Sequence, residues 1–297
     1  MRAEALGLDE VWLGDEGPAR DPFALLAAAA CATHRIRLGV GVTNPYLRHP
    51  ATTAASALTI HELSGGRMLL GIGPGGDLAL KPAHVERIQP LTATRRAVRI
   101  IRAVSRGEST EGYTPAPHAV VADDLPVFIG SRGEQFNRFA SEAADGVFLA
   151  GIPRSRLAIS ASWARSRHQI DIAVYASAVF DPISLEAMRP RMIYALLDAP
   201  EATRRELGVS RTDVVEAARA MADGDDRPAR KLVDDRLLAE LVVYGNPAEV
   251  GNCLAERFRP LRPTSIGVAL LADDPLSVLE RAAAALSVAA HAMGDER

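Results

Sequence analysis

Polar residues that could hold a substrate or a cofactor follow two predicted strands near the start of this sequence. Asp15 and Glu16 come after the predicted strand Asp9–Leu13, and Asn44 comes after the β-branched run Ile36–Val42. The carboxyl ends of parallel strands meet at one edge of a sheet, so these side chains are expected at a common edge. Carboxylates there can orient a reacting molecule, although such residues can also be mere caps or turn formers. We take Asp15, Glu16 and Asn44 as the candidate catalytic residues.

A cluster of glycines follows the third apolar run, Arg67–Ile72. Positions 71–76 read GIGPGG, which fits the G-x-G-x-x-G pattern of a dinucleotide-binding turn. Pro74 falls inside that turn, and no clear strand ending in an acid follows about 20 residues later, so a Rossmann fold is not favoured. The missing side chains at Gly73, Gly75 and Gly76 are instead expected to let a planar cofactor approach the backbone.

A second glycine turn, GSRG at positions 130–133, lies between the predicted strand Leu125–Ile129 and the predicted helix Glu134–Ala144. Backbone N–H groups at a helix start, a hydroxyl and a guanidinium together favour a phosphate. The serine could instead be only a helix N-cap. The candidate phosphate-binding residues are Gly130, Ser131, Arg132 and Gly133.

The composition narrows the class of protein. The net charge of −3 gives no reason to expect nucleic acid or a membrane surface as a partner. Cys31 and Cys253 are the only cysteines, and the seven histidines show no paired metal-ligand spacing, so no metal site is expected. No basic leader followed by an apolar stretch begins the sequence, and the apolar run Phe23–Ala32 is too short to span a membrane. We expect a cytoplasmic protein.

Strand candidates alternate with helical patterns along the chain, which predicts an α/β fold with a parallel sheet. The length suits one domain over residues 1–297, a TIM-barrel-like (β/α)8 unit. A long loop at Gly107–Asp124 is expected to pass over the active edge, and a mostly helical insertion at about 181–239 is expected to shape the substrate pocket. The seven strand candidates are Asp9–Leu13, Ile36–Val42, Arg67–Ile72, Leu125–Ile129, Gly146–Leu149, Ile170–Val179 and Ser265–Leu270.

Four phrases of the sequence resemble a known family. They are LGLDEVWLGDE from Leu6, GVGVTNPYLRHPATTAASALTIHELSGGRMLLGIGPGG from Gly39, PVFIGSRGEQFNRFASEAADGVFLAG from Pro126 and VYGNPAEVGNCLAERF from Val243. The chain is similar to the bacterial-luciferase-like flavin and deazaflavin oxidoreductases, above all to the F-420-dependent branch that includes methylenetetrahydromethanopterin reductase.

The resemblance implies a function and a set of contacts. It implies hydride transfer between coenzyme F-420 and a small organic substrate, in a homodimer. It implies a cis peptide at Gly41–Val42 that backs the deazaflavin ring, with Thr43 beside it, and a phosphate-bearing cofactor tail near the second glycine turn. There are two alternatives: an FMN-dependent monooxygenase, and a non-catalytic flavin-binding protein with an incomplete barrel.

The sequence departs from the family pattern in three places. Glu16 stands where members often have histidine. Gly76 stands where the sugar-phosphate dehydrogenases of the group carry an acid, which disfavours glucose-6-phosphate as substrate. Met1–Leu6 has the pattern of the last turns of a helix, so a whole first strand and most of a first helix are expected to be absent from this chain. A late start site, a trimmed sequence or a natural open barrel would each account for this. An open barrel edge invites aggregation, which favours a missing segment or a covering partner.

Overall fold

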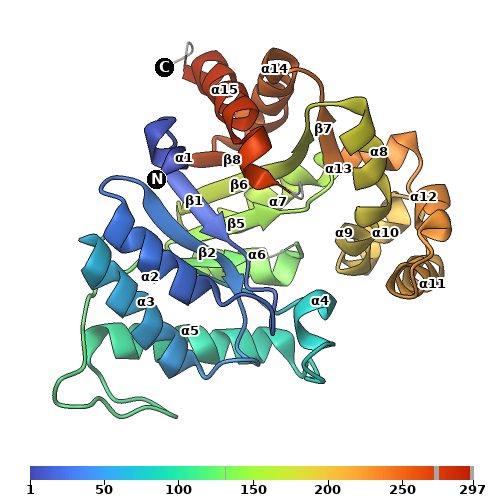
Figure 1. Cartoon of the computed structure of the whole chain (residues 1–297). Coiled ribbons are helices and arrows are strands. Elements are labelled where there is room, and N and C mark those ends of the chain that lie inside the picture. Colours follow the sequence, from blue (N-terminus) through green and yellow to red (C-terminus); the bar gives the residue numbers. More distant parts are fainter. Residues whose placement is uncertain (131, 271–273, 295–297) are drawn as a thin grey trace. The chain divides into compact units, whose positions relative to one another are not determined.

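The computed structural model describes residues 1–130, 132–270 and 274–294 (Figure 1). The chain forms two compact units. The first contains Met1–Phe148 and Ala164–Ile170, and the second contains Leu149–Trp163 and Asp171–Arg297. Every residue proposed from the sequence as part of the cofactor site belongs to the first unit.

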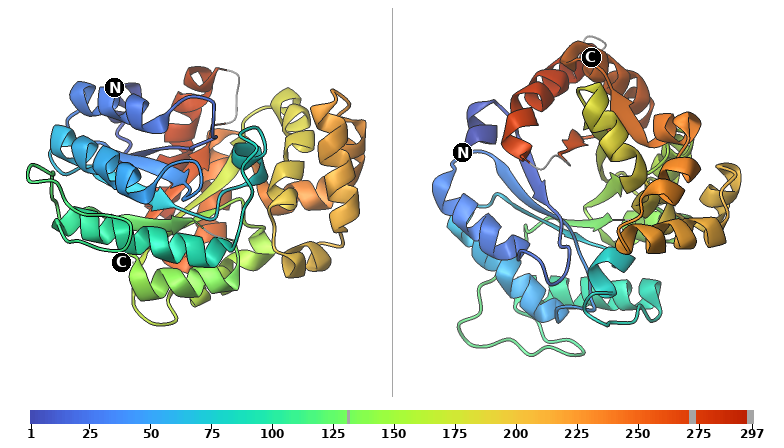
Figure 2. Two further views of the ribbon diagram at one scale, coloured as in Figure 1. Left: turned by 90° about the horizontal axis from the view of Figure 1, so that it is seen from below. Right: turned by 45° about the vertical axis from the view of Figure 1, so that its right-hand side comes forward.

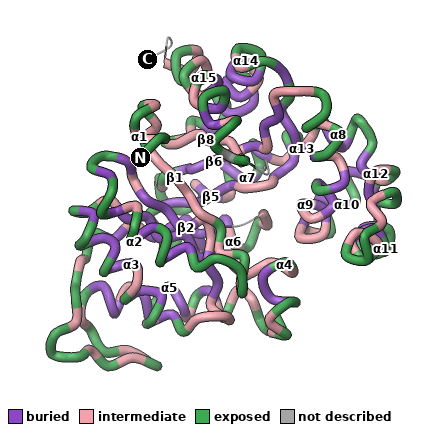
Figure 3. The backbone as a smooth tube through the Cα atoms, viewed as in Figure 1, coloured by how far each residue is buried: buried purple, intermediate pink, exposed green. Residues whose placement is uncertain are grey.

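The first unit is built on parallel strands that pair in the order of the sequence. The paired part of the last strand, Gly146–Phe148, lies in this unit. Buried residues, purple in Figure 3, follow most of these strands; all of β3 is buried, whereas the residues of β1 are only partly buried. The strands are β1 (Glu10–Leu13), β2 (Arg37–Thr43), β3 (Met68–Ile72), β4 (Val127–Gly130) and β5 (Gly146–Ala150).

Helices pack along this sheet, and α3 contacts both α2 and α5, as both views of Figure 2 show. The Asp21 carboxylate caps α2 by accepting hydrogen bonds from the N–H groups of Phe23 and Ala24, as the Asp-Pro start signal predicts. Gly65 ends α3 in the left-handed region at φ 67°, which glycine adopts without steric cost. The helices are α1 (Arg2–Ala5), α2 (Pro22–Ala32), α3 (Pro50–Ser64), α4 (Asp77–Leu80), α5 (Pro90–Arg106) and α6 (Glu134–Ala143).

One arginine ties the helices to the strands at the amino end of the sheet. Arg67 uses all five guanidinium N–H donors: they bond to the carbonyl oxygens of Ala30, Thr33, Ile36 and Ser64 and to the Thr33 hydroxyl, at 2.7 to 3.1 Å. Carbonyl groups at the ends of α2 and α3 are thereby satisfied.

A carboxylate holds the segment before β2 in the same region. Glu4 in α1 accepts hydrogen bonds from the N–H groups of His34, Arg35 and Ile36, the latter two at 2.8 and 2.9 Å. These N–H groups, that of Ile36 first, lower the pKa of Glu4 to about 2.

The loop at 107–124 does not pass over the active edge, and that expectation is wrong. The Ala122 N–H donates to the Ser105 carbonyl at 2.9 Å, and Arg106 pairs with Asp123 at 3.0 Å. Because the loop joins the end of α5 to the start of β4, its ends are fixed at the amino end of the strands (Figure 1).

The second unit contains three strands, with β6 (Asp171–Val179) between β7 (Val242–Tyr244) and β8 (Ser265–Ala269), all parallel. The described residues therefore hold eight strands, and the count of seven made from the sequence is wrong. It missed β7, whose three residues are too few to show an alternating or apolar run.

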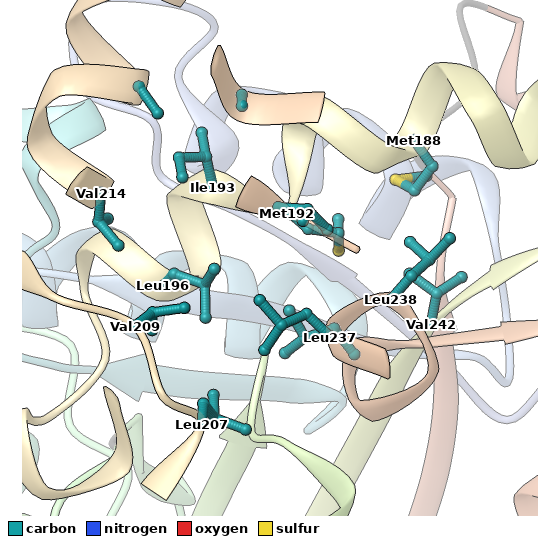
Figure 4. Close-up of a cluster of buried hydrophobic side chains, with 14 of the residues drawn as sticks. Met188, Met192, Ile193, Leu196, Leu207, Val209, Val214, Leu237, Leu238 and Val242 are labelled. Carbon is teal, nitrogen blue, oxygen red and sulfur yellow. The ribbon is translucent and has the colours of Figure 1, made fainter. Parts of the chain in front are cut away.

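The stretch expected to be a helical insertion contains its own apolar core. Buried side chains from several helices pack together with Val179 and Val242 (Figure 4). Its helices are α8 (Pro182–Arg191), α9 (Ile193–Leu197), α10 (Glu201–Glu206), α11 (Arg211–Ala222), α12 (Arg227–Leu232) and α13 (Asp235–Leu241).

The remaining helical elements of this unit flank the strands, and α14 packs against α15. They are η1 (Arg154–Arg156), α7 (Leu157–Ala164, whose last residue falls in the first unit), α14 (Pro247–Phe258), η2 (Arg259–Leu261) and α15 (Pro275–Gly294). No helix within the described ranges combines the length and the apolar character needed to cross a membrane.

Candidate cofactor site

A bulge interrupts β2 at the carboxyl edge of the first sheet. Val40 pairs with Leu70 and Thr43 pairs with Ile72, so two residues of β2 stand opposite the single residue between Leu70 and Ile72. The peptide bond between Gly41 and Val42 is cis, as the resemblance implied. The bulge breaks the regular ladder and exposes part of the Gly41–Val42 backbone.

Three glycines make room for the Val42 side chain. A Cβ added at Gly130 would lie 2.6 Å from Val42 Cγ1, one at Gly71 would lie 2.8 Å from Val42 Cγ1, and one at Gly73 would lie 3.0 Å from Val42 Cγ2. The space left at Gly130 is thus occupied by the protein's own valine, and the space left at Gly73 is occupied by the Gly130 carbonyl oxygen, 2.8 Å from the added Cβ, and by the valine. Packing accounts for these glycines, and their contact with a cofactor stays a prediction.

Aromatic rings lie beneath the bulge. Trp12 packs against Phe148 with ring centroids 4.6 Å apart and against Phe128 at 5.4 Å. A Cβ on Gly41 would approach Phe148 to 2.9 Å and Trp12 to 3.1 Å, so only glycine fits at this position. The rings support the bulge from the inside of the unit. The sequence analysis missed all three, although the low aromatic content, 5%, makes any strand tryptophan worth attention.

Asp15 is brought into direct contact with the end of β2. The Thr43 hydroxyl, fully buried, donates to the Asp15 carboxylate at 2.6 Å. Gly17 N–H also donates to Asp15, at 3.3 Å, and the Gly73 N–H donates to the Thr43 carbonyl at 2.9 Å. Asp15 therefore fixes the orientation of Thr43, and the expectation that the two strand ends share an edge is correct.

Asn44 has one of the two roles weighed from the sequence, that of a turn former, and its role as a site residue stays a prediction. Its side-chain oxygen accepts from the N–H groups of Tyr46 and Leu47, at 3.1 and 3.0 Å, which makes it a turn former. Its side-chain nitrogen has no hydrogen-bond partner among the described residues. Asn44 is only 2% exposed, so the turn holds a free amide donor in a fixed position beside the bulge.

Glu16 differs from Asp15. Its side chain is exposed and makes no hydrogen bond or ion pair within the described part of the chain. It leaves the edge of the sheet open to solvent on this side, and its catalytic role stays a prediction.

The first glycine cluster forms a turn, and two side chains in this region, one cationic and one phenolic, donate to backbone carbonyl groups. Gly75 has φ 72° and lies against Asn44, while Gly76 is the N-cap of α4. Arg87 donates to the Gly75 carbonyl at 2.7 Å, and the Tyr46 hydroxyl donates to the Ile88 carbonyl at 2.8 Å. Burial raises the pKa of Tyr46. No pattern in the sequence indicated these two contacts, because each joins residues that are far apart along the chain.

The second glycine turn is described only in part. Ser131 lies outside the described residues. Gly133 is the N-cap of α6. Arg132 and Gly133 are half-buried at the end of β4. Phosphate binding by Gly130, Arg132 and Gly133 is compatible with this placement and stays a prediction.

The residues at this edge fit a flat, polar cofactor. The bulge offers backbone without a side chain at Gly41, the aromatic rings support it, and Asn44 offers an unpaired donor. No group of three or more metal-ligating side chains occurs in the part of the chain that the structure describes.

Known proteins are similar to this chain in sequence. The family described as luciferase-like monooxygenase matches residues 1–264. The 5,10-methylenetetrahydromethanopterin reductase of Methanolobus tindarius is 31% identical over 263 residues, which cover 82% of this chain and 81% of that protein. The F-420-dependent glucose-6-phosphate dehydrogenase of Kineococcus radiotolerans is 28% identical over 280 residues, 84% of this chain and 79% of that protein.

Solved structures agree on the fold. The coenzyme F-420 dependent tetrahydromethanopterin reductase from Methanopyrus kandleri matches with a TM-score of 0.79 at 24% identity, covering 95% of this chain and 91% of that one. A monooxygenase from Streptomyces bottropensis matches with a TM-score of 0.68 at 20% identity, covering 99% and 90%. The α/β fold is therefore that of the luciferase-like TIM-barrel structures, and the chain belongs to the luciferase-like monooxygenase family.

Proposed function

We propose that this protein is an F-420-dependent oxidoreductase that transfers a hydride between the deazaflavin and a small organic substrate. The observation that carries the proposal is the carboxyl edge of the first sheet. There a side-chain-free bulge at Gly41 stands over aromatic rings, next to the unpaired amide of Asn44. Relatives whose names specify F-420, or a reductase of this branch, support it.

The chain's own residues would bind the cofactor and orient it. Gly41 and Val42 would lie against the ring, Asn44 would donate to a carbonyl on its polar rim, and Asp15 would keep Thr43 in place. When bound, the deazaflavin supplies the hydride chemistry, so no protein nucleophile is required. Glu16, at the exposed side of the edge, would face the substrate.

An FMN-dependent monooxygenase is the second candidate, because the matching family and one structural neighbour are described as monooxygenases, and another neighbour, a type II Baeyer–Villiger monooxygenase from Pseudomonas putida, is in complex with FMN. The fold and the bulge suit either cofactor. A titration of the protein with F-420 and with FMN, followed by cofactor fluorescence, separates the two. Saturable binding of F-420 with FMN far weaker supports the reductase, and the reverse preference supports the monooxygenase. Binding of neither cofactor to the folded protein would contradict both.

Asn44→Asp is the sharpest variant for this titration. The carboxylate keeps an acceptor for the N–H groups of Tyr46 and Leu47, so the turn is preserved, but it removes the free donor. We expect F-420 binding to weaken by about tenfold, the value of one hydrogen bond to a buried partner. A carboxylate is costly to bury at this position, which is 2% exposed, so thermal unfolding is measured to establish that the variant is folded during the titration. Unchanged affinity would remove Asn44 from the site.

We also propose that the chain is a homodimer. Helix α2 carries no charged or polar side chain apart from Cys31, yet Leu25 is 47% exposed. A helix that is apolar on all sides is normally covered, and an uncharged face can pair with its own copy without repulsion. Light scattering should give twice the chain mass, and Leu25→Glu should yield monomers. A monomeric wild type would contradict the proposal.

A further inference from the structure

Arg204 is a buried cation without a counter-ion. It lies in α10 of the second unit and is only 5% exposed. One guanidinium nitrogen donates to the Ala199 carbonyl, and the Nε atom has no partner. No carboxylate forms an ion pair with Arg204 within the described residues. Burying a charge is costly unless an opposite charge compensates it. The dipole of a single carbonyl group does not compensate a full positive charge.

Nearby charges do not remove this imbalance. Glu201, one turn earlier, is 79% exposed and pairs with Arg205 at 3.0 Å. Burial lowers the pKa of Arg204 first, the positive charge of Arg211 lowers it further, and the negative charge of Glu201 offsets only part of this. A second guanidinium therefore lies within electrostatic reach, and no carboxylate forms an ion pair with Arg204 or Arg211 within the described residues.

The chain folds back so that the start of α11 comes close to Arg204. The Val209 N–H donates to the Arg204 carbonyl at 3.0 Å. Ser210 then caps α11 by accepting from the Asp213 N–H at 3.0 Å. The Asp213 carboxylate, at the exposed side of this turn, makes no ion pair with Arg204.

A third arginine adds to the positive field. Arg236 of α13 donates to the Leu207 carbonyl at 2.7 Å, in the turn between α10 and α11. By contrast, the nearby Arg156 is neutralised, because it pairs with Glu206 at 2.8 Å.

We propose that Arg204 and Arg211 bind a small oxyanion, a phosphate or a carboxylate, at the turn between α10 and α11. A guanidinium presents N–H groups in a fork that matches the oxygens of either group. The anion would lie beside the Arg204 guanidinium and supply the missing negative charge. The site belongs to the second unit, and its existence does not depend on which cofactor the first unit binds.

Calorimetric titration with inorganic phosphate and with acetate, at constant ionic strength in chloride, tests this site. We expect one saturable site for at least one of the two anions, and the preference between them identifies the ligand class. Arg204→Met and Arg211→Met should each weaken binding by about tenfold or more. Arg205→Met is the matched control, since it removes the same charge from the same helix at a residue that is 78% exposed; its affinity should stay within twofold of the wild type.

Three results would overturn the proposal. They are no saturable binding of either anion, equal binding by Arg211→Met and the wild type, and an equal loss in the Arg205→Met control. If Arg204→Met fails to fold, the exposed Arg211→Met variant decides alone. An F-420 titration on the same samples keeps the two sites apart, because both variants should bind the cofactor as the wild type does.

Discussion

Replacing Gly130 with alanine should destabilise the fold through one identifiable clash. The new Cβ would lie 2.6 and 2.8 Å from the two γ-carbons of Val42 and 3.2 Å from its Cβ. Real Cβ atoms do not approach other carbons this closely, so either Val42 or the β4 backbone must move. Inserting a methyl group into a filled space costs typically about 1–3 kcal/mol, and the two short contacts place this site within that range.

Val42→Ala removes the two clashing carbons and provides the matched test. Alone it loses the partial burial of two methyl groups, about 1 kcal/mol for a half-buried side chain. If the clash is the cause, Gly130→Ala should cost little once Val42 is alanine. The double variant should then be more stable than the sum of the single effects by about 1–2 kcal/mol, as contacting residues often show.

Urea unfolding of the four proteins gives the coupling free energy directly. Gly71→Ala is the control, because its Cβ would lie 2.3 Å from the carbonyl oxygen of Val40, a backbone atom that Val42→Ala leaves in place. Little rescue is therefore expected there. Additive effects of Gly130→Ala and Val42→Ala would refute the explanation that these glycines exist to seat the valine of the bulge.

Three further outcomes follow from the contacts described. Arg67→Met should lower the free energy of unfolding by about 2–4 kcal/mol, because several buried carbonyl groups lose their donor at once; urea unfolding measures this, and a change below 1 kcal/mol would contradict it. The Glu4 pKa is depressed from 4.5 to about 2 in the folded state, so its stabilisation is present above pH 4.5 and is lost as the pH falls towards 2. Glu4→Gln should accordingly flatten the acid side of the stability profile, and an unchanged profile would count against it. Asp15→Ala should release the Thr43 hydroxyl and weaken F-420 binding by severalfold with little loss of stability; fluorescence titration and thermal unfolding would separate these effects.

Local sequence signals located the elements of the first unit well. The start of α2 at Asp21 and the end of α3 at Gly65 depend on a cap and a left-handed glycine, which the sequence displays directly. Strand β7 was missed because three residues are too few to show a periodic pattern. It is a strand because it pairs with β6. The loop at 107–124 was assigned to the wrong edge because composition identifies a loop but says nothing of its side of the sheet.

The glycines show where such inference reaches its limit. Their clustering after β3 and β4 marks the carboxyl edge of the first sheet, but room for a planar cofactor, the reason inferred for the first cluster, is not needed to explain Gly73. The room at Gly73 is filled by the Gly130 carbonyl oxygen and by Val42, and the room at Gly130 is filled by Val42. A glycine in the sequence indicates that some group approaches the backbone there, but only the fold shows which group it is. At this edge the glycines leave room for the valine of the bulge, and the bulge lies beside Asn44, where we propose that the cofactor binds.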